Sequence, residues 1–414
     1  MAYSTFAMTL ALVLTRPHVG SGRRIGPAAA AVAGVAVMLV GGVLTPADLA
    51  TAADILWRPL VVITSIMVMT VVARRLAVLD WLAAATDRLG GRSASRLFAC
   101  VFTLSALSAT VLNNDGAVLV LTPLVVGLVR RRYPRDPELI APFAFALFMA
   151  AGVAPLIVSN PMNMIAASYA GIGFNEYARS MVPVAVAGGL VGFAVLRTVF
   201  RGELDAAPPA APPEPVAPPG PAQRWMMLLL IGVLGAYSPV AYVGGPIWVV
   251  AATGAALAWA LAVRRGVERP LASIRAEVSW DILVFLCMVF LIGNGLRNVG
   301  AVDHVAWLYA RVGIATIGVL SAVGSALLNN HPMVIINMMA LDSVPGAGKR
   351  EMLAVLVGGD LGPRLLPMGS LAGLLWLAAL RRSGVDVSLG RFARIGAIVT
   401  VPTLAVSLLL LRWL

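Results

Sequence analysis

Long apolar runs, separated by short clusters of arginine, constrain the fold of this chain more than any motif does. In the first half they cover roughly residues 3–15, 27–44 and 56–73. A helix of about 20 such residues crosses the hydrocarbon core of a bilayer and satisfies its own backbone hydrogen bonds. The whole chain is 60% hydrophobic and 12% charged, with a mean hydropathy of +0.90. Water-soluble globules do not have this composition, so we predict an all-α polytopic membrane protein.

The arginine clusters explain the formal net charge of +12. Cytoplasmic loops of membrane proteins have such clusters, so the charge does not indicate a nucleic-acid partner. If Arg23-Arg24 and Arg74-Arg75 are both cytoplasmic, the N-terminus lies outside. No charged segment precedes the apolar stretch 6–14, which therefore predicts a short first span and no signal peptide.

Polar residues interrupt the apolar run from about 94 to 129. Its middle contains Asn113, Asn114, Asp115 and Gly116. Its ends are both rich in arginine, which a single span would not show. We predict a re-entrant hairpin that enters and leaves from the cytoplasm. Each arm gives about 24 Å of helix at about 1.5 Å per residue, so the tip reaches deep into the bilayer.

The next apolar run, about 139–170, is too long for one straight helix. Prolines and hydrogen-bonding residues interrupt it: Pro155, Ser159, Asn160, Pro161 and Asn163. The pattern predicts a broken helix whose unwound middle, 155–163, presents carbonyls, amides and a helix N-terminus at the depth of the hairpin tip. A proline kink packed by neighbouring helices is the alternative.

Residues 202–223 mark the clearest boundary in the chain. Eight prolines lie between Pro208 and Pro221, which is typical of an extended soluble linker. We predict that this linker is cytoplasmic and that it joins two repeats, 1–201 and 224–414.

The second half repeats the order of the first. Apolar runs near 225–240, 246–263 and 279–296 precede a second hairpin, about 312–341, and a second broken helix, about 352–380, unwound at 358–364. Short amphipathic segments, 77–89 and 302–308, precede the two hairpins. Each half crosses the membrane an odd number of times, about five, so the second repeat is expected to be inverted.

The second hairpin has a tip like that of the first. Leu-Asn-Asn recurs there, as Asn329 and Asn330, and is followed by His331 and Pro332. We expect the two tips and the two broken helices to meet near the midplane and form one substrate site.

Amides dominate the expected site, and an amide both donates and accepts hydrogen bonds, as a hydroxyl does. A small neutral polyhydroxy solute is therefore favoured over a permanent anion, which would need a cationic clamp. Arg364 is the one arginine near the expected site, and Asp360 could neutralise it across one helical turn. The predicted substrate-binding residues are Asn113, Asn114, Ser159, Asn160, Asn163, Asn329, Asn330, Gly362 and Ser370.

Three titratable residues are candidates for coupling transport to protons: Asp115, His331 and Asp360. Each also has a structural interpretation. Asp115 could cap the second arm of its hairpin, His331 could be a packing residue, and Asp360 could form a structural pair with Arg364. The asparagines could be turn formers. Gate or structural roles are assigned to Gly116, Pro155, Pro161, Pro332, Pro363 and Arg364.

Several stretches resemble the signatures of the ArsB-type arsenite efflux permeases, within the larger ion transporter superfamily. They are Asn114-Asp115-Gly116-Ala117-Val118-Leu119-Val120-Leu121-Thr122-Pro123, Pro155-Leu156-Ile157-Val158-Ser159-Asn160, Gly293-Asn294-Gly295-Leu296-Arg297-Asn298, Asp360-Leu361-Gly362-Pro363-Arg364 and Pro367-Met368-Gly369-Ser370-Leu371-Ala372. The similarity runs from about residue 75 to the C-terminus.

This resemblance implies export of arsenite or antimonite, as neutral trihydroxides, from the cytoplasm of a prokaryote across its inner membrane. It also implies proton antiport and, in some members, a partner ATPase. Two departures affect the coupling. An acidic residue commonly precedes the segment matching Pro155, where this chain has Met149, Ala150 and Ala151, and His331 stands at a usually apolar position.

We therefore predict a secondary-active carrier with an alternating-access, elevator-like mechanism and no cofactor. A sodium- or proton-coupled organic anion symporter and a passive channel for neutral solutes are the alternatives. An enzyme is not expected, because the sequence shows no metal cluster and no nucleophile beside a base. Cys100 and Cys287 lie in separate apolar runs and indicate neither a disulfide nor a thiolate metal site.

Overall fold

The computed structural model describes residues 1–15, 18–19, 23–267 and 269–414, without the side chains at 14, 18–19, 23–24 and 115. In this part of the chain seven helices are long and apolar enough to cross a membrane. They are α3 (Pro46–Arg75), α5 (Ala94–Leu112), α9 (Phe174–Val199), α11 (Pro221–Tyr242), α12 (Ile247–Arg264), α14 (Trp280–Asn298) and α20 (Leu389–Trp413). The predicted all-α polytopic fold is confirmed.

The first half begins with two short helices and a pair of two-residue strands. Helices α1 (Ala2–Thr15) and α2 (Pro27–Val40) are apolar but shorter than a full crossing. Between them β1 (His18–Val19) pairs antiparallel with β2 (Arg23–Arg24), and His18 lies opposite Arg24. The side chains of Arg23-Arg24 lie outside the described part, so the cytoplasmic position of that pair stays a prediction.

The two segments predicted as hairpins and the two predicted as broken helices each contain two helices, whose path through a bilayer stays a prediction. The first half continues with α4 (Val78–Gly90), α5, α6 (Asn114–Arg132), η1 (Pro137–Leu139), α7 (Ile140–Ala150), η2 (Ile157–Ser159), α8 (Pro161–Tyr169), α9 and α10 (Arg201–Ala206). The second continues after α12 with α13 (Pro270–Glu277), α14, α15 (Ala301–Tyr309), α16 (Ile314–Leu328), α17 (Asn330–Asp342), α18 (Lys349–Leu361), η3 (Gly362–Arg364), η4 (Pro367–Gly369), α19 (Leu371–Arg382) and α20.

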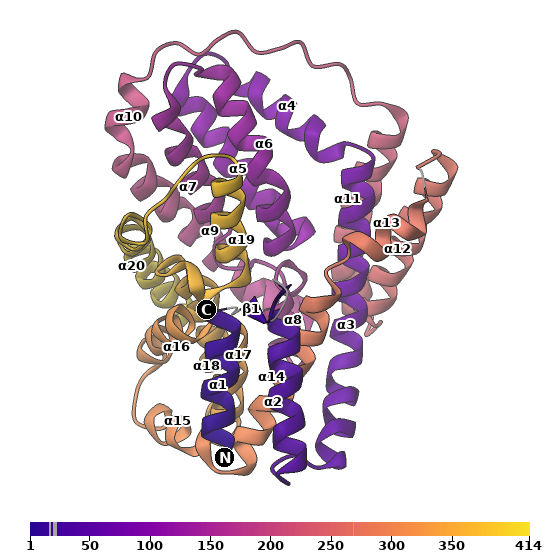
Figure 1. The fold of residues 1–414 in the computed structure, drawn as a ribbon, viewed down its shortest axis with the longest axis vertical. Coiled ribbons are helices and arrows are strands. Elements are labelled where there is room, and N and C mark those ends of the chain that lie inside the picture. Colours follow the sequence, from indigo (N-terminus) through magenta and orange to yellow (C-terminus); the bar gives the residue numbers. More distant parts are fainter. Residues whose placement is uncertain (16–17, 20–22, 268) are drawn as a thin grey trace.

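Packing between helices follows the repeated order. Helix α3 packs against α12 and α14 against α2, which are equivalent pairs if the halves correspond, and α9 packs against its counterpart α20. Figure 1 shows α4 and the α5–α6 hairpin toward one end of the molecule, and α15 with the α16–α17 hairpin toward the other. This arrangement agrees with an inverted repeat, whose orientation in a bilayer stays a prediction.

The segment between the halves is shorter than predicted. Helix α10 extends to Ala206 and α11 begins at Pro221, so only 207–220 lacks regular structure. In Figure 1 it crosses the end of the molecule that holds the first hairpin. The backbone N–H groups of Ala210 and Ala211 donate to the carbonyls of Arg92 and Arg132, at 3.0 and 3.1 Å. The segment is thereby tied to both outer ends of that hairpin.

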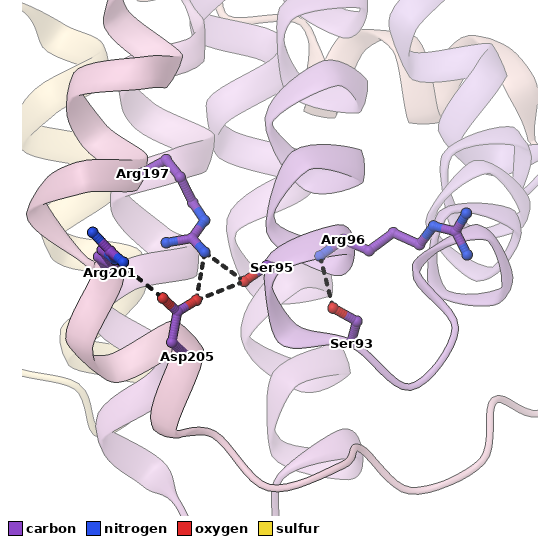
Figure 2. A network of polar contacts seen from close by, with 6 residues as sticks. All are labelled: Ser93, Ser95, Arg96, Arg197, Arg201 and Asp205. Atoms are coloured by element: carbon purple, nitrogen blue, oxygen red, sulfur yellow. Dashed lines mark hydrogen bonds and ion pairs between the residues drawn. The ribbon is translucent and has the colours of Figure 1, made fainter.

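Helix α10 is fixed to the same end of the molecule by one carboxylate. Figure 2 shows Asp205 accepting hydrogen bonds from Arg197 at 2.5 Å and from Arg201 and Ser95 at 3.4 Å. Arg197 also donates to Ser95 at 2.9 Å. In Figure 2 the Arg96 backbone belongs to a separate contact, the cap that Ser93 gives to α5.

Candidate functional site

The two hairpin tips share one strained backbone turn. Asn113 has φ +66° and ψ 160°, and Asn329 has φ +79° and ψ 140°. Residues other than glycine rarely adopt these angles, at a cost of about 1–3 kcal/mol. Each side chain offsets part of this cost by capping the next helix: Asn113 accepts from Gly116 N at 2.9 Å, and Asn329 from His331 N at 3.2 Å. The first asparagine of each pair is therefore a turn former, as the structural interpretation predicted.

In each broken helix, a polar side chain caps the N-terminus of the helix that follows the break. Asn160 accepts from Met162 N at 3.1 Å at the start of α8, with Pro161 at the first helical position. Ser370 accepts from Gly373 N at 3.0 Å at the start of α19. Both residues, predicted as substrate ligands, have this local role.

The positions of the breaks differ from the sequence predictions. The first break covers 151–160, so Asn163 lies within helix α8 and not in the unwound middle. The second was expected at 358–364, but α18 continues to Leu361, and the 3₁₀ turns η3 and η4 follow at 362–364 and 367–369. Gly358-Gly359 does not break the helix.

Asp360 connects the second half to the break in the first. Its carboxylate accepts hydrogen bonds from Ala154 N at 2.8 Å, Asn160 Nδ2 at 2.8 Å and Asn163 Nδ2 at 3.0 Å. The residue is 6% exposed. Asn163 Nδ2 is also 2.7 Å from the Tyr177 hydroxyl, which donates to the Ala154 carbonyl at 3.0 Å. This network fixes the geometry of the unwound segment.

Arg364 does not form the expected ion pair with Asp360. No salt bridge joins these two described side chains, and the Arg364 guanidinium donates instead to the Met149 carbonyl in the last turn of α7. A cation at this position satisfies a carbonyl that the end of a helix leaves without an intrahelical partner. Arg364 is thus placed at the point where the family resemblance led us to look for an acid.

A cavity of about 510 Å³, termed the first cavity, lies between α5, the break and α9. The Ser159 hydroxyl donates to the Thr110 carbonyl at 3.0 Å. The polar part of the lining contains Thr103, Thr110, Asn114, Ser159 and Asn160. Apolar side chains complete the wall: Phe102, Leu107, Val186, Leu190 and Phe193. None of the residues lining this cavity is charged.

The lining of the first cavity is drawn from the first half of the chain alone. Asn114, Pro155, Ser159 and Asn160 were predicted from the sequence, whereas Thr110 was not. Thr110 lies one helical turn before Asn113, and this spacing could have indicated it. Tyr177 was also missed, because its contact with Asn163 depends on how α9 packs.

No described residue of the second tip lines the first cavity, so this cavity does not join the two tips, and the sharing of one site by both tips stays a prediction. Asn329, Asn330 and His331 are buried, and the His331 ring packs edge-on against Phe285 with centroids 6.0 Å apart. The Nε2 atom of His331 and the Oδ1 atom of Asn330 have no partner among the described residues.

The remaining predicted residues lie at the tips and at the second break. Asn113 and Gly116 line a separate pocket of about 60 Å³ with Arg74 and Glu277, which form a salt bridge. Pro332 lies in the first turn of α17, and Gly362 and Pro363 lie in η3. The Asp115 side chain lies outside the described residues.

Comparison with known proteins identifies the family. The sequence model described as "ArsB: Arsenical pump membrane protein" matches residues 1–414. The arsenical pump membrane protein of Escherichia coli (strain K12) is 31% identical over 99% of this chain and 97% of its own length. The putative arsenical pump membrane protein of Bacillus subtilis (strain 168) is 25% identical over 97% of each chain. The crystal structure of the Alcanivorax borkumensis YdaH transporter has a similar fold, with a TM-score of 0.58 at 19% identity over 100% of this chain and 96% of that one.

Proposed function

The chain belongs to the ArsB family of arsenical pump membrane proteins, and from this premise we propose that it exports arsenite and antimonite across the cytoplasmic membrane as neutral trihydroxides. The first cavity is the proposed substrate site. Bacterial relatives named as arsenical pump membrane proteins support the substrate class.

The observation that carries this proposal is the chemistry of the cavity lining. Three hydroxyl side chains and two amides offer donors and acceptors, and no lining side chain is charged: the five are Thr103, Thr110, Ser159, Asn114 and Asn160. A trihydroxide both donates and accepts hydrogen bonds and has no charge to neutralise. An organic anion would leave its carboxylate without a cationic partner, so the symporter alternative has less support.

Proton coupling is assigned to Asp360. The ionised carboxylate accepts three N–H groups of the first break. Protonation converts one of its oxygens to a donor, which conflicts with those N–H groups and releases Asn160, a residue of the cavity wall. Solute binding and proton binding are thereby linked through one side chain. His331 and Asp115 remain secondary candidates.

The carrier is proposed to alternate by an elevator-like movement of the hairpins and broken helices against the other spans. Association with a pump ATPase is a further expectation from the family. The N-terminus is placed outside and the segment 207–220 in the cytoplasm.

Transport by inverted membrane vesicles tests the proposal. With an inside-acid gradient, vesicles holding the protein should accumulate arsenite above the external concentration, and a protonophore should abolish the accumulation. Vesicles without the protein are the control. Flux without uphill accumulation would identify a passive channel. Sodium-dependent uptake of a dicarboxylate with no arsenite uptake would identify the symporter.

A further inference from the structure

A second cavity, of about 690 Å³, lies on another side of the broken helix. Residues of α3, α8, the start of α9 and the α11–α12 connection line it, among them Trp57, Ile157, Ser168 and Asn175. Its volume is comparable to that of the first cavity, and the proposed function does not use it.

One 3₁₀ turn borders both cavities. In η2, Ile157 lines the second cavity and Ser159 lines the first. The turn is tightly packed, because Ile157, Val158 and Ser159 are each less than 5% exposed. Two positions in the chain thus separate a residue that faces one cavity from a residue that faces the other.

Helix α9 shows that the cavities lie at different depths. The first cavity touches α9 around Gly189, and the second touches it at Phe174 to Glu176. The 13 positions from Glu176 to Gly189 correspond to roughly 20 Å along a helix. The C-terminal end of α9 leads to α10 and the segment 207–220, so the second cavity lies toward the end of α9 remote from them.

The chemistry of the second cavity suits the same class of solute. Its charged residues are engaged: the Arg58 guanidinium lies 5.1 Å from the Trp57 ring centre, and Glu176 is paired with Lys349 at 2.7 Å. Ser168 and Asn175 supply a hydroxyl and an amide. A neutral solute with hydroxyl groups can therefore bind there without displacing an ion pair.

We propose that η2 is the wall between two solute sites that open to opposite faces of the membrane, and that the second cavity is the release site for the small neutral polyhydroxy solute bound in the first. The identity of the solute rests on the proposed function, but the opposed access of the two cavities does not. During the proposed elevator-like movement, passage of the solute then includes displacement of Ile157 and Val158, which lie in the wall between the two cavities.

Cysteine accessibility tests this arrangement. In a background with Cys100→Ser and Cys287→Ser, Ile157→Cys and Ser159→Cys are introduced one at a time. A small membrane-impermeant methanethiosulfonate is applied to right-side-out and to inside-out vesicles, and the remaining free thiols are counted with a maleimide. Ser159→Cys should react only from the side of the membrane that holds the segment 207–220, and Ile157→Cys only from the opposite side. Reaction of both from one side, or of neither, would overturn the proposal.

A second pair of cysteine variants keeps the test decisive if the first two variants misfold. Ala154→Cys in the first cavity and Met164→Cys in the second should show the same opposed reactivity. The labelling requires no arsenite, so the two failures are distinguishable: opposed labelling without arsenite transport contradicts the proposed function, and arsenite transport without opposed labelling contradicts the role of η2.

Discussion

The two halves of the molecule have the same order of elements, yet their packing differs between hairpin and broken helix: the first half borders the first cavity there, whereas helices of the second half meet closely. In the second half α16 lies directly against α18 and η3. A Cβ atom on Gly358 would fall 2.2 Å from the Gly318 carbonyl oxygen, and one on Gly362 would fall 2.3 Å from that of Ala322. In the first half, helix α5 instead lines the first cavity with Phe102, Ala106 and Thr110.

This difference indicates that the two halves contribute differently to the region around the first cavity. The first half lines the first cavity, which is the proposed substrate site, whereas the second half provides Asp360, whose carboxylate accepts hydrogen bonds from Ala154 N and Asn160 Nδ2 in the wall of that cavity. A duplicated topology therefore does not imply a duplicated site, because a few small residues decide whether the same helices close or leave a space.

Filling the tight contact of the second half should have the largest effect on stability. Gly358→Leu places a side chain against the α16 backbone, so we expect a loss of about 3 kcal/mol or complete misfolding. Ala106→Leu, the matched change on the first-cavity wall, should cost much less because the new atoms enter empty space. Unfolding in detergent, followed by tryptophan fluorescence, measures both. Equal losses would show that the halves are packed alike.

Asp360→Asn removes the charge that links the halves. The new amide places an N–H against N–H groups of the first break, so we expect a loss of about 2 kcal/mol and arsenite uptake that no longer responds to a pH gradient. Asp342→Asn, at an exposed pair with Arg297, is the control and should change neither. Gradient-driven uptake that persists in Asp360→Asn would remove Asp360 from the coupling.

The two tips should respond alike to changes in their turning residue. Asn113→Ala and Asn329→Ala each remove a helix cap and keep the strained φ. We expect each variant to lose about 1 kcal/mol of unfolding free energy. Asn113→Gly and Asn329→Gly relieve the strain and should be neutral or stabilising. Thermal unfolding of the four variants measures this. A large difference between the tips would show that their common backbone geometry is not energetically equivalent.

The smallest effect is expected at α10, the short helix that follows α9. The hydrogen bond from Arg197 lowers the pKa of Asp205 below its ordinary value. Asp205 therefore adds stability above its unfolded-state pKa, and this contribution disappears as the pH falls through the lower folded-state pKa. Asp205→Asn should lower the melting temperature slightly at pH 7 and not at all near pH 2. The same small change at both pH values would contradict an electrostatic role.

Much of the fold was predictable from the sequence. Composition gave the class, and Asn-Asn pairs within apolar runs located both tips, because a membrane tolerates them only in a protected turn. The second break was misplaced because Gly358-Gly359 resembles a helix breaker. Helix α18 is unbroken there, and the two glycines permit close packing, Gly358 against α16 and Gly359 against Val334 of α17 and Met162 of α8.

The site was predictable only in part. Ser159 and Asn160 follow from the interrupted run. The attachment of Asp360 to Ala154 depends on contacts across more than 200 positions, which local patterns do not encode. The i,i+4 spacing predicted a pair between Asp360 and Arg364. The Arg364 guanidinium instead donates to the Met149 carbonyl, which the end of α7 leaves without an intrahelical partner.

The most direct test asks whether the first half alone builds the substrate site. It compares arsenite uptake by inverted vesicles that hold Asn114→Ala with uptake by vesicles that hold Asn330→Ala. These residues occupy equivalent positions after the two tips, and only Asn114 lines the first cavity. Loss of one hydrogen bond, about 1 kcal/mol, should raise the half-saturating arsenite concentration about fivefold in Asn114→Ala and leave it unchanged in Asn330→Ala. Equal increases in both variants, or an increase in Asn330→Ala alone, would contradict a substrate site built by the first half.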